Sequence, residues 1–233
     1  ASIGSAGVVT FNKVIDVSLP LFLQNTSEIP KLQLVIMNLS FFCDAYIKVF
    51  NVEDSSVTDK ISENSLNLFK DEILIILGKA LTGSSKVETT IRTLSVIQFT
   101  KMAKMNGYLN EEEIALILQY LTDTILTDNN KAIYHTCLEG LKAIGEIYED
   151  LVYSISLKRM LDLLPLNPSD KISLSDSEPV EKENILKVIL DFTTSKHRLI
   201  RESLVGLSAK LYSVAMHENS KEYCFLLVSS LYT

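Results

Sequence analysis

One short pattern recurs along this chain, near the start of what the hydrophobic spacing predicts to be the second helix of a pair. An apolar residue is followed three positions later by Leu and usually then by Ser, and each copy follows a polar turn that contains a lysine. The copies begin at Ile36, Ile91, Leu138 and Leu204, after Lys31, Lys86, Lys131 and Lys196. Helix–turn–helix units that recur about every 40 to 70 residues are typical of HEAT or armadillo solenoids. The sequence therefore predicts an all-α fold, an α-solenoid of antiparallel helix pairs.

The predicted organisation is a single segment, residues 1–233, of a longer HEAT solenoid. The sequence divides it into about five helix pairs, 7–50, 66–106, 110–152, 154–195 and 197–233, with mobile loops at 51–64 and 166–181. The register after residue 152 is open. Simple alternation pairs 154–164 with 183–194, whereas the internal match pairs 183–194 with 197–217.

Several helices carry local signals of their own. Pro20 predicts a bend or an early stop in a helix over 8–24. Asn110, followed by three glutamates, predicts a capped helix start, and consecutive glutamates on a helix diverge too much to hold one ion. The run Ile73–Leu77 is apolar on every face and predicts a helix buried between neighbours. Long helices are expected over 132–152 and 199–217.

Composition narrows the classes of function. The chain is 47% hydrophobic with a net charge of −7, so it is expected to bury a core and to repel nucleic-acid phosphates. Its longest apolar stretch, 32–50, is interrupted by polar residues, which argues against a membrane span. No signal peptide is visible. Protein surfaces are thus the expected partners, with no direct nucleic acid and no membrane.

No group of residues forms a recognisable reactive centre. Cys43, Cys137 and Cys224 are too far apart in the sequence for a metal-binding motif and are expected to be reduced, with core packing as their usual role. His135 and Cys137 point about 200° apart on a helix, so they cannot share a metal. The remaining histidines, His197 and His217, have no ligand at useful spacing. We therefore predict no enzyme and no cofactor, with catalytic, cofactor-binding and metal residues all assigned as none.

The glycine pair Gly78 and Gly83 has the spacing of a phosphate-binding loop. Ser84 replaces the lysine that such a loop requires, and the segment follows a helix instead of a strand, so this interpretation is rejected.

Three features keep two interpretations each. Arg92 lies among apolar positions and either bridges adjacent repeats or faces a concave binding surface. The basic group Lys196, His197, Arg198 and Arg201 either meets an acidic partner or is a solvated face. The stretch 175–178 (SDSE) is either a kinase-accessible site or a solvated loop. Partner-binding residues cannot be assigned from these patterns.

Four runs carry a resemblance to a known family: TIRTLSVIQFTKMAKMNGYL (90–109), residues 125–165 from ILTDNN to MLDLLP, ILDFTTSKH (189–197) and KEYCFLL (221–227). They resemble a fungal member of the large HEAT-repeat scaffold of the cytosolic iron–sulfur protein assembly targeting complex. This family is named for sensitivity to methyl methanesulfonate and is linked to DNA repair and transcription. The resemblance covers essentially the whole chain, strongest over 86–165, and implies a middle fragment of a protein about four times longer.

The resemblance implies a function that the residues alone do not define. A member of this family would be a non-catalytic adaptor that helps deliver iron–sulfur clusters to apo-proteins, including DNA repair and replication enzymes. Its partners would be a WD-repeat propeller, a small acidic assembly factor and apo iron–sulfur clients, in the cytoplasm and the nucleus. The alternative is a different HEAT-repeat scaffold for protein interactions, such as a nuclear transport, proteasome or kinase adaptor.

Overall fold

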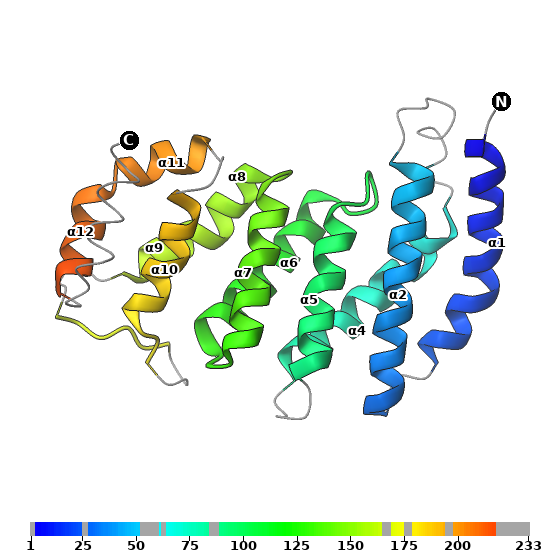
Figure 1. The fold of residues 1–233 in the computed structure, drawn as a ribbon, viewed down its shortest axis with the longest axis horizontal. Helices are drawn as coiled ribbons and strands as arrows, with labels where there is room; N and C mark the ends of the chain where they lie inside the picture. Colours follow the sequence, from blue (N-terminus) through cyan, green and yellow to red (C-terminus); the bar gives the residue numbers. More distant parts are fainter. Residues whose placement is uncertain are drawn as a thin grey trace.

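The structure is a computed structural model that describes residues 3–24, 28–51, 61, 64–83, 89–164, 169–174, 179–193 and 198–217. Every regular element in these ranges is helical (Figure 1). The elements are α1 (Ile3–Leu23), α2 (Ile29–Phe50), the 3₁₀ turn η2 (Ser65–Phe69), α4 (Lys70–Thr82), α5 (Thr89–Ala103), α6 (Glu111–Thr127), α7 (Lys131–Gly145), α8 (Glu149–Leu151), the π turn η4 (Val152–Leu157), α9 (Lys158–Leu163), α10 (Lys182–Thr193), α11 (Arg198–Val205) and α12 (Ser208–His217).

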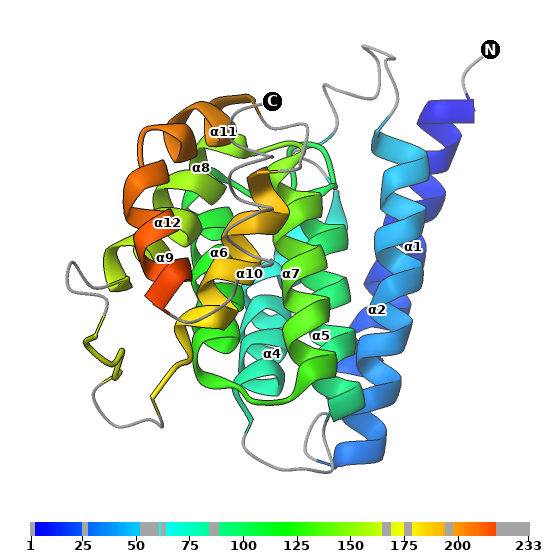
Figure 2. The same cartoon turned by 60° about the vertical axis from the view of Figure 1, so that its left-hand side comes forward.

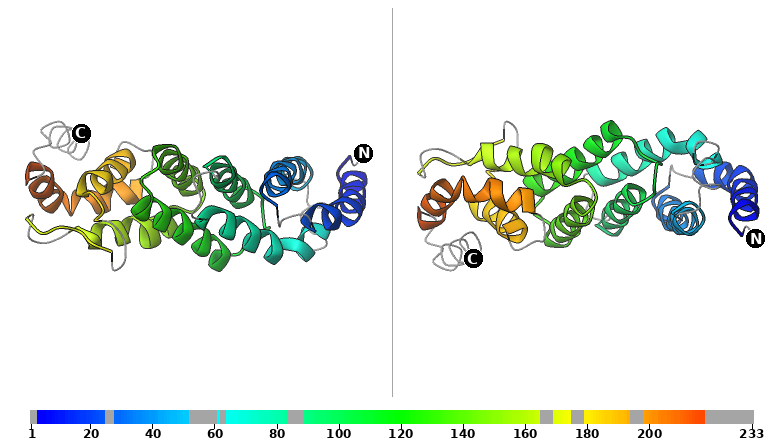
Figure 3. Two further views of the ribbon diagram at one scale, coloured as in Figure 1. Left: turned by 90° about the horizontal axis from the view of Figure 1, so that it is seen from below. Right: turned by 90° about the horizontal axis from the view of Figure 1, so that it is seen from above.

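The helices stack sideways in two layers, which gives an elongated row instead of a closed globule (Figures 1 and 3). One layer contains α2, α5, α7 and α10. The other begins with α1 and continues through α4, α6 and the run from α8 to α9. Extensive contacts join α1 to α2, α4 to α5 and α6 to α7 within pairs, and α2 to α5 and α5 to α7 between pairs. The predicted all-α solenoid is confirmed.

Local chemistry explains where the helices start. The Asn110 side chain accepts a 2.8 Å bond from the amide of Glu113, whose carboxylate accepts a 2.8 Å bond from the amide of Asn110. This reciprocal pair is the predicted helix start, and it satisfies two backbone donors that the helix cannot pair internally. Pro30 occupies the first turn of α2, where its missing N–H costs nothing. Asn130 caps α7 through the amide of Ala132 at 3.0 Å.

The core runs without a break through the described helices. Ile36, Phe99, Leu121 and Leu141 are buried members of the same cluster, although they come from four different helices. Gly140 permits close packing of α7 on α5, because a Cβ there would lie 3.0 Å from the Thr100 hydroxyl oxygen and 3.2 Å from a Val96 methyl. The stacked layers therefore share one hydrophobic interior, as expected when each helix pair cannot bury its apolar side alone.

The structure corrects two helix boundaries. The helix expected over 132–152 ends at Gly145, and the chain restarts at Glu149 and continues through η4 into α9. The apolar spacing runs on through this break, so periodicity could not locate it. The single helix expected over 199–217 is two helices, α11 and α12, separated at Gly206 and Leu207. Pro20 does not end α1, which continues to Leu23.

Three expectations about burial also change. Ile75 is 55% exposed, so the Ile73–Leu77 run is not buried on all sides. Asn64, at the end of the expected exposed loop, is buried and caps η2 by accepting from the amide of Asn67. In the described part of the second loop, Ile172 is buried and forms an isolated antiparallel bridge with Val180. The other residues of both loops lie largely outside the described ranges.

The arrangement of the later helices bears on the open register. α10 continues the layer of α2, α5 and α7 (Figure 3), and the Tyr134 hydroxyl of α7 donates to the Asn184 carbonyl of α10 at 3.2 Å. This arrangement is the one that simple alternation expects. The division into five pairs stays a prediction, because the second helix of the last pair lies outside the described residues.

Candidate partner-binding surface

An unusually apolar surface lies at the end of the row formed by α1 and α2, which run side by side (Figure 2). Half of the exposed large hydrophobic side chains in the described part of the chain belong to these two helices. They are Val9, Val14, Val17 and Leu21 from α1 and Ile29, Leu34, Met37 and Phe41 from α2. Contiguous exposed apolar surface of this kind marks a contact site for another macromolecule.

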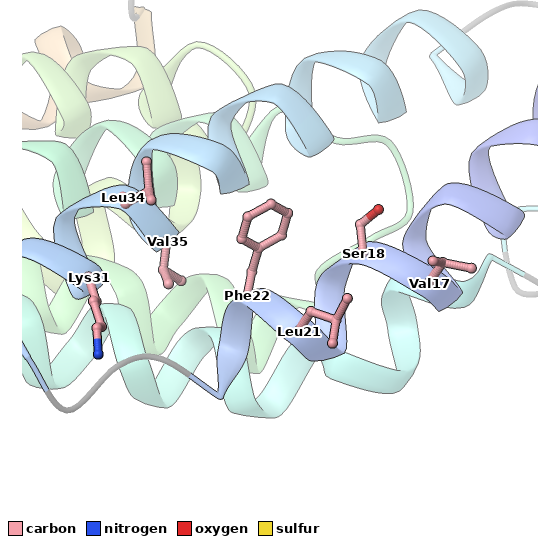
Figure 4. Close-up of a pocket in the computed structure, with 7 residues that line it drawn as sticks. All are labelled: Val17, Ser18, Leu21, Phe22, Lys31, Leu34 and Val35. Atoms are coloured by element: carbon pink, nitrogen blue, oxygen red, sulfur yellow. The ribbon is translucent and has the colours of Figure 1, made fainter.

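Two hollows follow the line where the helices meet, and together we call them the α1/α2 groove. The first has a volume of about 480 Å³ and is shown in Figure 4; its lining is Val17, Ser18, Leu21 and Phe22 from α1 and Lys31, Leu34 and Val35 from α2. The second, of about 490 Å³, is lined by Ala6, Gly7, Thr10, Phe11 and Val14 from α1 and Phe42, Ala45 and Val49 from α2.

The groove offers little hydrogen bonding to a ligand. The Thr10 hydroxyl already donates to the Ala6 carbonyl at 2.9 Å, and the Lys31 ammonium pairs with Glu28 at 2.8 Å. Ser18 is the remaining polar lining residue with a side-chain hydroxyl. The rings of Phe22 and Phe42 meet between the two helices with centroids 6.2 Å apart. A groove of this chemistry suits apolar side chains presented by a helix.

By length and apolar composition alone, two helices near the N-terminus meet the criterion for crossing a membrane, Ala6–Leu23 and Ile29–Phe50. The polar interruptions that argue against a span were noted above for the stretch 32–50 only. Core helices of helical-repeat proteins meet the same criterion, and α2 packs along α5 as the other helices of its layer do. The two helices are therefore weak indicators of a membrane span.

Charged side chains are used mainly to connect neighbouring helices. The Lys101 ammonium of α5 lies 2.6 Å from both the Asp44 carboxylate and the Ser40 hydroxyl of α2. Ion pairs of the same kind recur along the row: Lys70–Glu113, Arg159–Asp123 and Lys142–Asp191. These residues fix how one helix pair sits on the next.

Arg92 resolves one of the open alternatives. Its Nε donates to the Leu81 carbonyl at the end of α4 at 2.7 Å, and its guanidinium pairs with Asp128 in the turn between α6 and α7. The Arg92 and Asp128 side chains are only 14% and 15% exposed. Arg92 thus bridges adjacent repeats and is not displayed to a partner.

The two thiols within the described ranges are core residues. Burial raises the pKa of the Cys43 thiol from 9.0 to about 12, and burial raises the pKa of the Cys137 thiol from 9.0 to about 12 as well. Both are free and buried, as predicted, while Cys224 lies outside the described residues. Buried thiols of such high pKa are poor nucleophiles and poor metal ligands at neutral pH.

We expect the thiols of Cys43 and Cys137 to react with iodoacetamide at pH 8 at least about 100-fold more slowly in the folded chain than in urea. Above pH 9 the unfolded thiols ionise while the folded ones stay protonated, so the free energy of unfolding should fall by about 1 kcal/mol per thiol at pH 10. Mass spectrometry of the labelled peptides and urea titrations at pH 8 and 10 measure the two effects. Rapid labelling of the native chain would contradict the burial of these side chains.

The described residues contain no group of three or more histidines, cysteines and acids placed to hold a metal ion. His135 is exposed on α7, where its ring meets that of Tyr134 edge-on, while Cys137 is fully buried. His217 ends α12. His197 and Lys196, the side chains of Arg198 and Arg201, and the stretch 175–178 all lie outside what the structure describes.

A two-layer stack of helix pairs with an open apolar groove at one end defines the class of protein: a segment of an α-solenoid. Its sequence is 57% identical, over the whole chain, to the DNA repair/transcription protein MMS19 of Saccharomyces cerevisiae. The chain belongs to this MMS19 family and corresponds to a segment of its members, since the match spans 23% of the yeast protein. The chain matches no general family profile.

More distant relatives match part of the chain. The "DNA repair/transcription protein mms19" of Schizosaccharomyces pombe is 28% identical over 61% of the chain and 13% of its own length. The "MMS19 nucleotide excision repair protein homolog" of Xenopus tropicalis is 24% identical over 64% of the chain and 14% of its own length. The match with the family therefore extends beyond fungi, in each case to a much longer protein.

The groove was not identified from the sequence. A helix pair was expected over 7–50, but the spacing alone could not say which of its apolar residues stay exposed. The signal was available, because α1 and α2 carry more apolar residues than one buried face requires: Val17 is 69% and Phe41 is 70% exposed.

Proposed function

We propose that this chain is part of a non-catalytic scaffold in DNA repair and transcription, and that the scaffold helps deliver iron–sulfur clusters to apo-proteins. The observation that carries the proposal is the 57% identity, along the full chain, to a protein named for DNA repair and transcription. The iron–sulfur role and the part played in both cytoplasm and nucleus come from the family resemblance found in the sequence.

The fold suits such a role in two ways. A row of stacked helix pairs presents long surfaces to large proteins, which is how solenoids bind. The cluster would be a cargo passed between partners, because Cys43 and Cys137 are separately buried and cannot supply the grouped thiolates that a cluster requires. The proposed partners are a WD-repeat propeller, a small acidic assembly factor and apo iron–sulfur clients.

Affinity purification of the tagged full-length protein tests the proposal. We expect the propeller subunit, the acidic factor and apo forms of iron–sulfur enzymes to be recovered together. Recovery of a small GTPase or of proteasome subunits in their place would favour the alternative, a nuclear transport or proteasome adaptor, and would overturn the proposal.

Iron analysis of the purified protein supplies an independent check. We expect no stoichiometric iron and no visible absorption from a cluster. About four irons per chain, retained through purification, would show a resident cluster and would contradict the scaffold role.

A further inference from the structure

We infer that the α1/α2 groove is the seat of a further helix pair of the same, longer protein, the pair that precedes α1 in its solenoid. The inference rests on the proposed function in one respect, since both place this chain within a longer scaffold. It adds a specific occupant for a surface that the described part of the chain leaves open.

Comparison of successive helices within one layer supports a missing neighbour. α5 lies between α2 and α7, and its only strongly exposed large hydrophobic residue is Ile97. α7, which packs against α5, exposes none of its large hydrophobic residues to that extent. α2 has a neighbour in its layer on the α5 side, and it leaves Leu34 57% and Phe41 70% exposed. The excess apolar surface therefore appears where a neighbour in the layer is missing.

α1 shows the same asymmetry in the other layer. Its Asn12 side chain accepts a 2.9 Å bond from the Ser65 amide at the start of η2, and its inner residues Ile15 and Leu19 are fully buried. Val17 and Leu21, which line the groove, are 69% and 62% exposed. Both helices of the pair thus turn an uncovered apolar flank toward the same side.

The relatives provide the chain length for such a neighbour. The aligned segment is 23% of the yeast relative, so the greater part of a family member lies outside this segment. A neighbouring pair of the same chain is held next to the groove at high effective concentration, which favours it over a partner that binds from solution.

The groove also constrains the shape of its occupant. The two hollows are centred about ten residues apart along α1, which corresponds to about 15 Å of helix. An incoming helix therefore needs about three turns, with large apolar side chains near both ends of that interval. The other helices of this layer are long enough, since α5 and α7 each have 15 residues.

Thiol accessibility in two lengths of the protein tests the inference. Leu21→Cys and Leu34→Cys place single thiols in the groove, while Leu68→Cys and Ile75→Cys serve as matched controls on η2 and α4, where Leu68 is 80% and Ile75 is 55% exposed. Each variant is made in the 233-residue chain and in the full-length protein. Labelling by a maleimide is followed by mass spectrometry of the peptide that carries each site, and circular dichroism checks that each variant is folded.

We expect the two groove thiols to react at least about tenfold more slowly in the full-length protein than in the 233-residue chain, because burial closes access to the reagent. The control thiols should react equally fast in both. Equal rates at the groove in both lengths would overturn the inference. So would protection that depends on the concentration of the shorter chain, which indicates a second copy, or protection that requires an added client protein. None of these outcomes affects the purification test of the proposed function.

Discussion

Replacing Tyr46 by Ala is expected to lower the free energy of unfolding by about 4 kcal/mol. The Tyr46 side chain is fully buried at the junction of the first two helix pairs. Its ring stacks on Phe50 with centroids 4.5 Å apart, meets Phe11 of α1 edge-on at 6.0 Å, and lies 5.6 Å from the ring of Tyr108 beyond α5. Alanine would remove these contacts at once and leave a cavity that several helices border.

Tyr46→Phe separates the packing contribution from the polar one. The Tyr46 hydroxyl donates a 2.8 Å bond to the Asn106 carbonyl, so this variant should lose only about 1 kcal/mol. Phe41→Ala on the same helix is a surface control and should change stability by less than about 0.5 kcal/mol, since Phe41 is 70% exposed. Urea unfolding followed by circular dichroism measures all three. A Tyr46→Ala variant as stable as Tyr46→Phe would show that the aromatic cluster does not hold the two pairs together.

Arg92→Ala is expected to cost about 3 kcal/mol, because it leaves the Asp128 carboxylate and the Leu81 carbonyl without their shared donor in a largely buried site. Arg92→Lys should recover only part of this loss. A lysine ammonium cannot copy the fixed fork of a guanidinium that contacts two acceptors on different elements.

A double-mutant cycle with Asp128→Ala isolates the Arg92–Asp128 interaction, and we expect a coupling above about 1 kcal/mol. The exposed pair Lys31–Glu28, with side chains 49% and 61% exposed, provides the comparison, and Lys31→Ala should cost less than about 0.5 kcal/mol. Equal effects of Arg92→Ala and Lys31→Ala in urea titrations would rule out a bridging role for Arg92.

Features that depend on local chemistry could be predicted from the sequence. The capped start at Asn110 follows from one side chain and its neighbours, and the buried thiols Cys43 and Cys137 follow from their apolar surroundings on helices. The order of helix pairs up to residue 145 follows from hydrophobic spacing and polar turns. Each of these signals lies within a few residues of the feature that it predicts.

Features that depend on neighbouring helices could not be predicted in the same way. Arg92 had two possible roles because its partners, Leu81 and Asp128, lie in other elements. The break after Gly145 went unnoticed because Ile144, Leu151 and Val152 continue a helical spacing across it. The groove could not be located for a similar reason: apolar residues on every side of a helix do not reveal which side a neighbour covers.

The ties between successive helix pairs are short-range and mostly single, as in the contacts of Lys101 with Asp44, Arg92 with Asp128 and Lys142 with Asp191. A row linked in this way resembles a leaf spring, whose curvature is the sum of small rotations at each joint. A load applied at one end would bend the row gradually along its length, and resetting a single joint would re-aim everything beyond it by several ångströms.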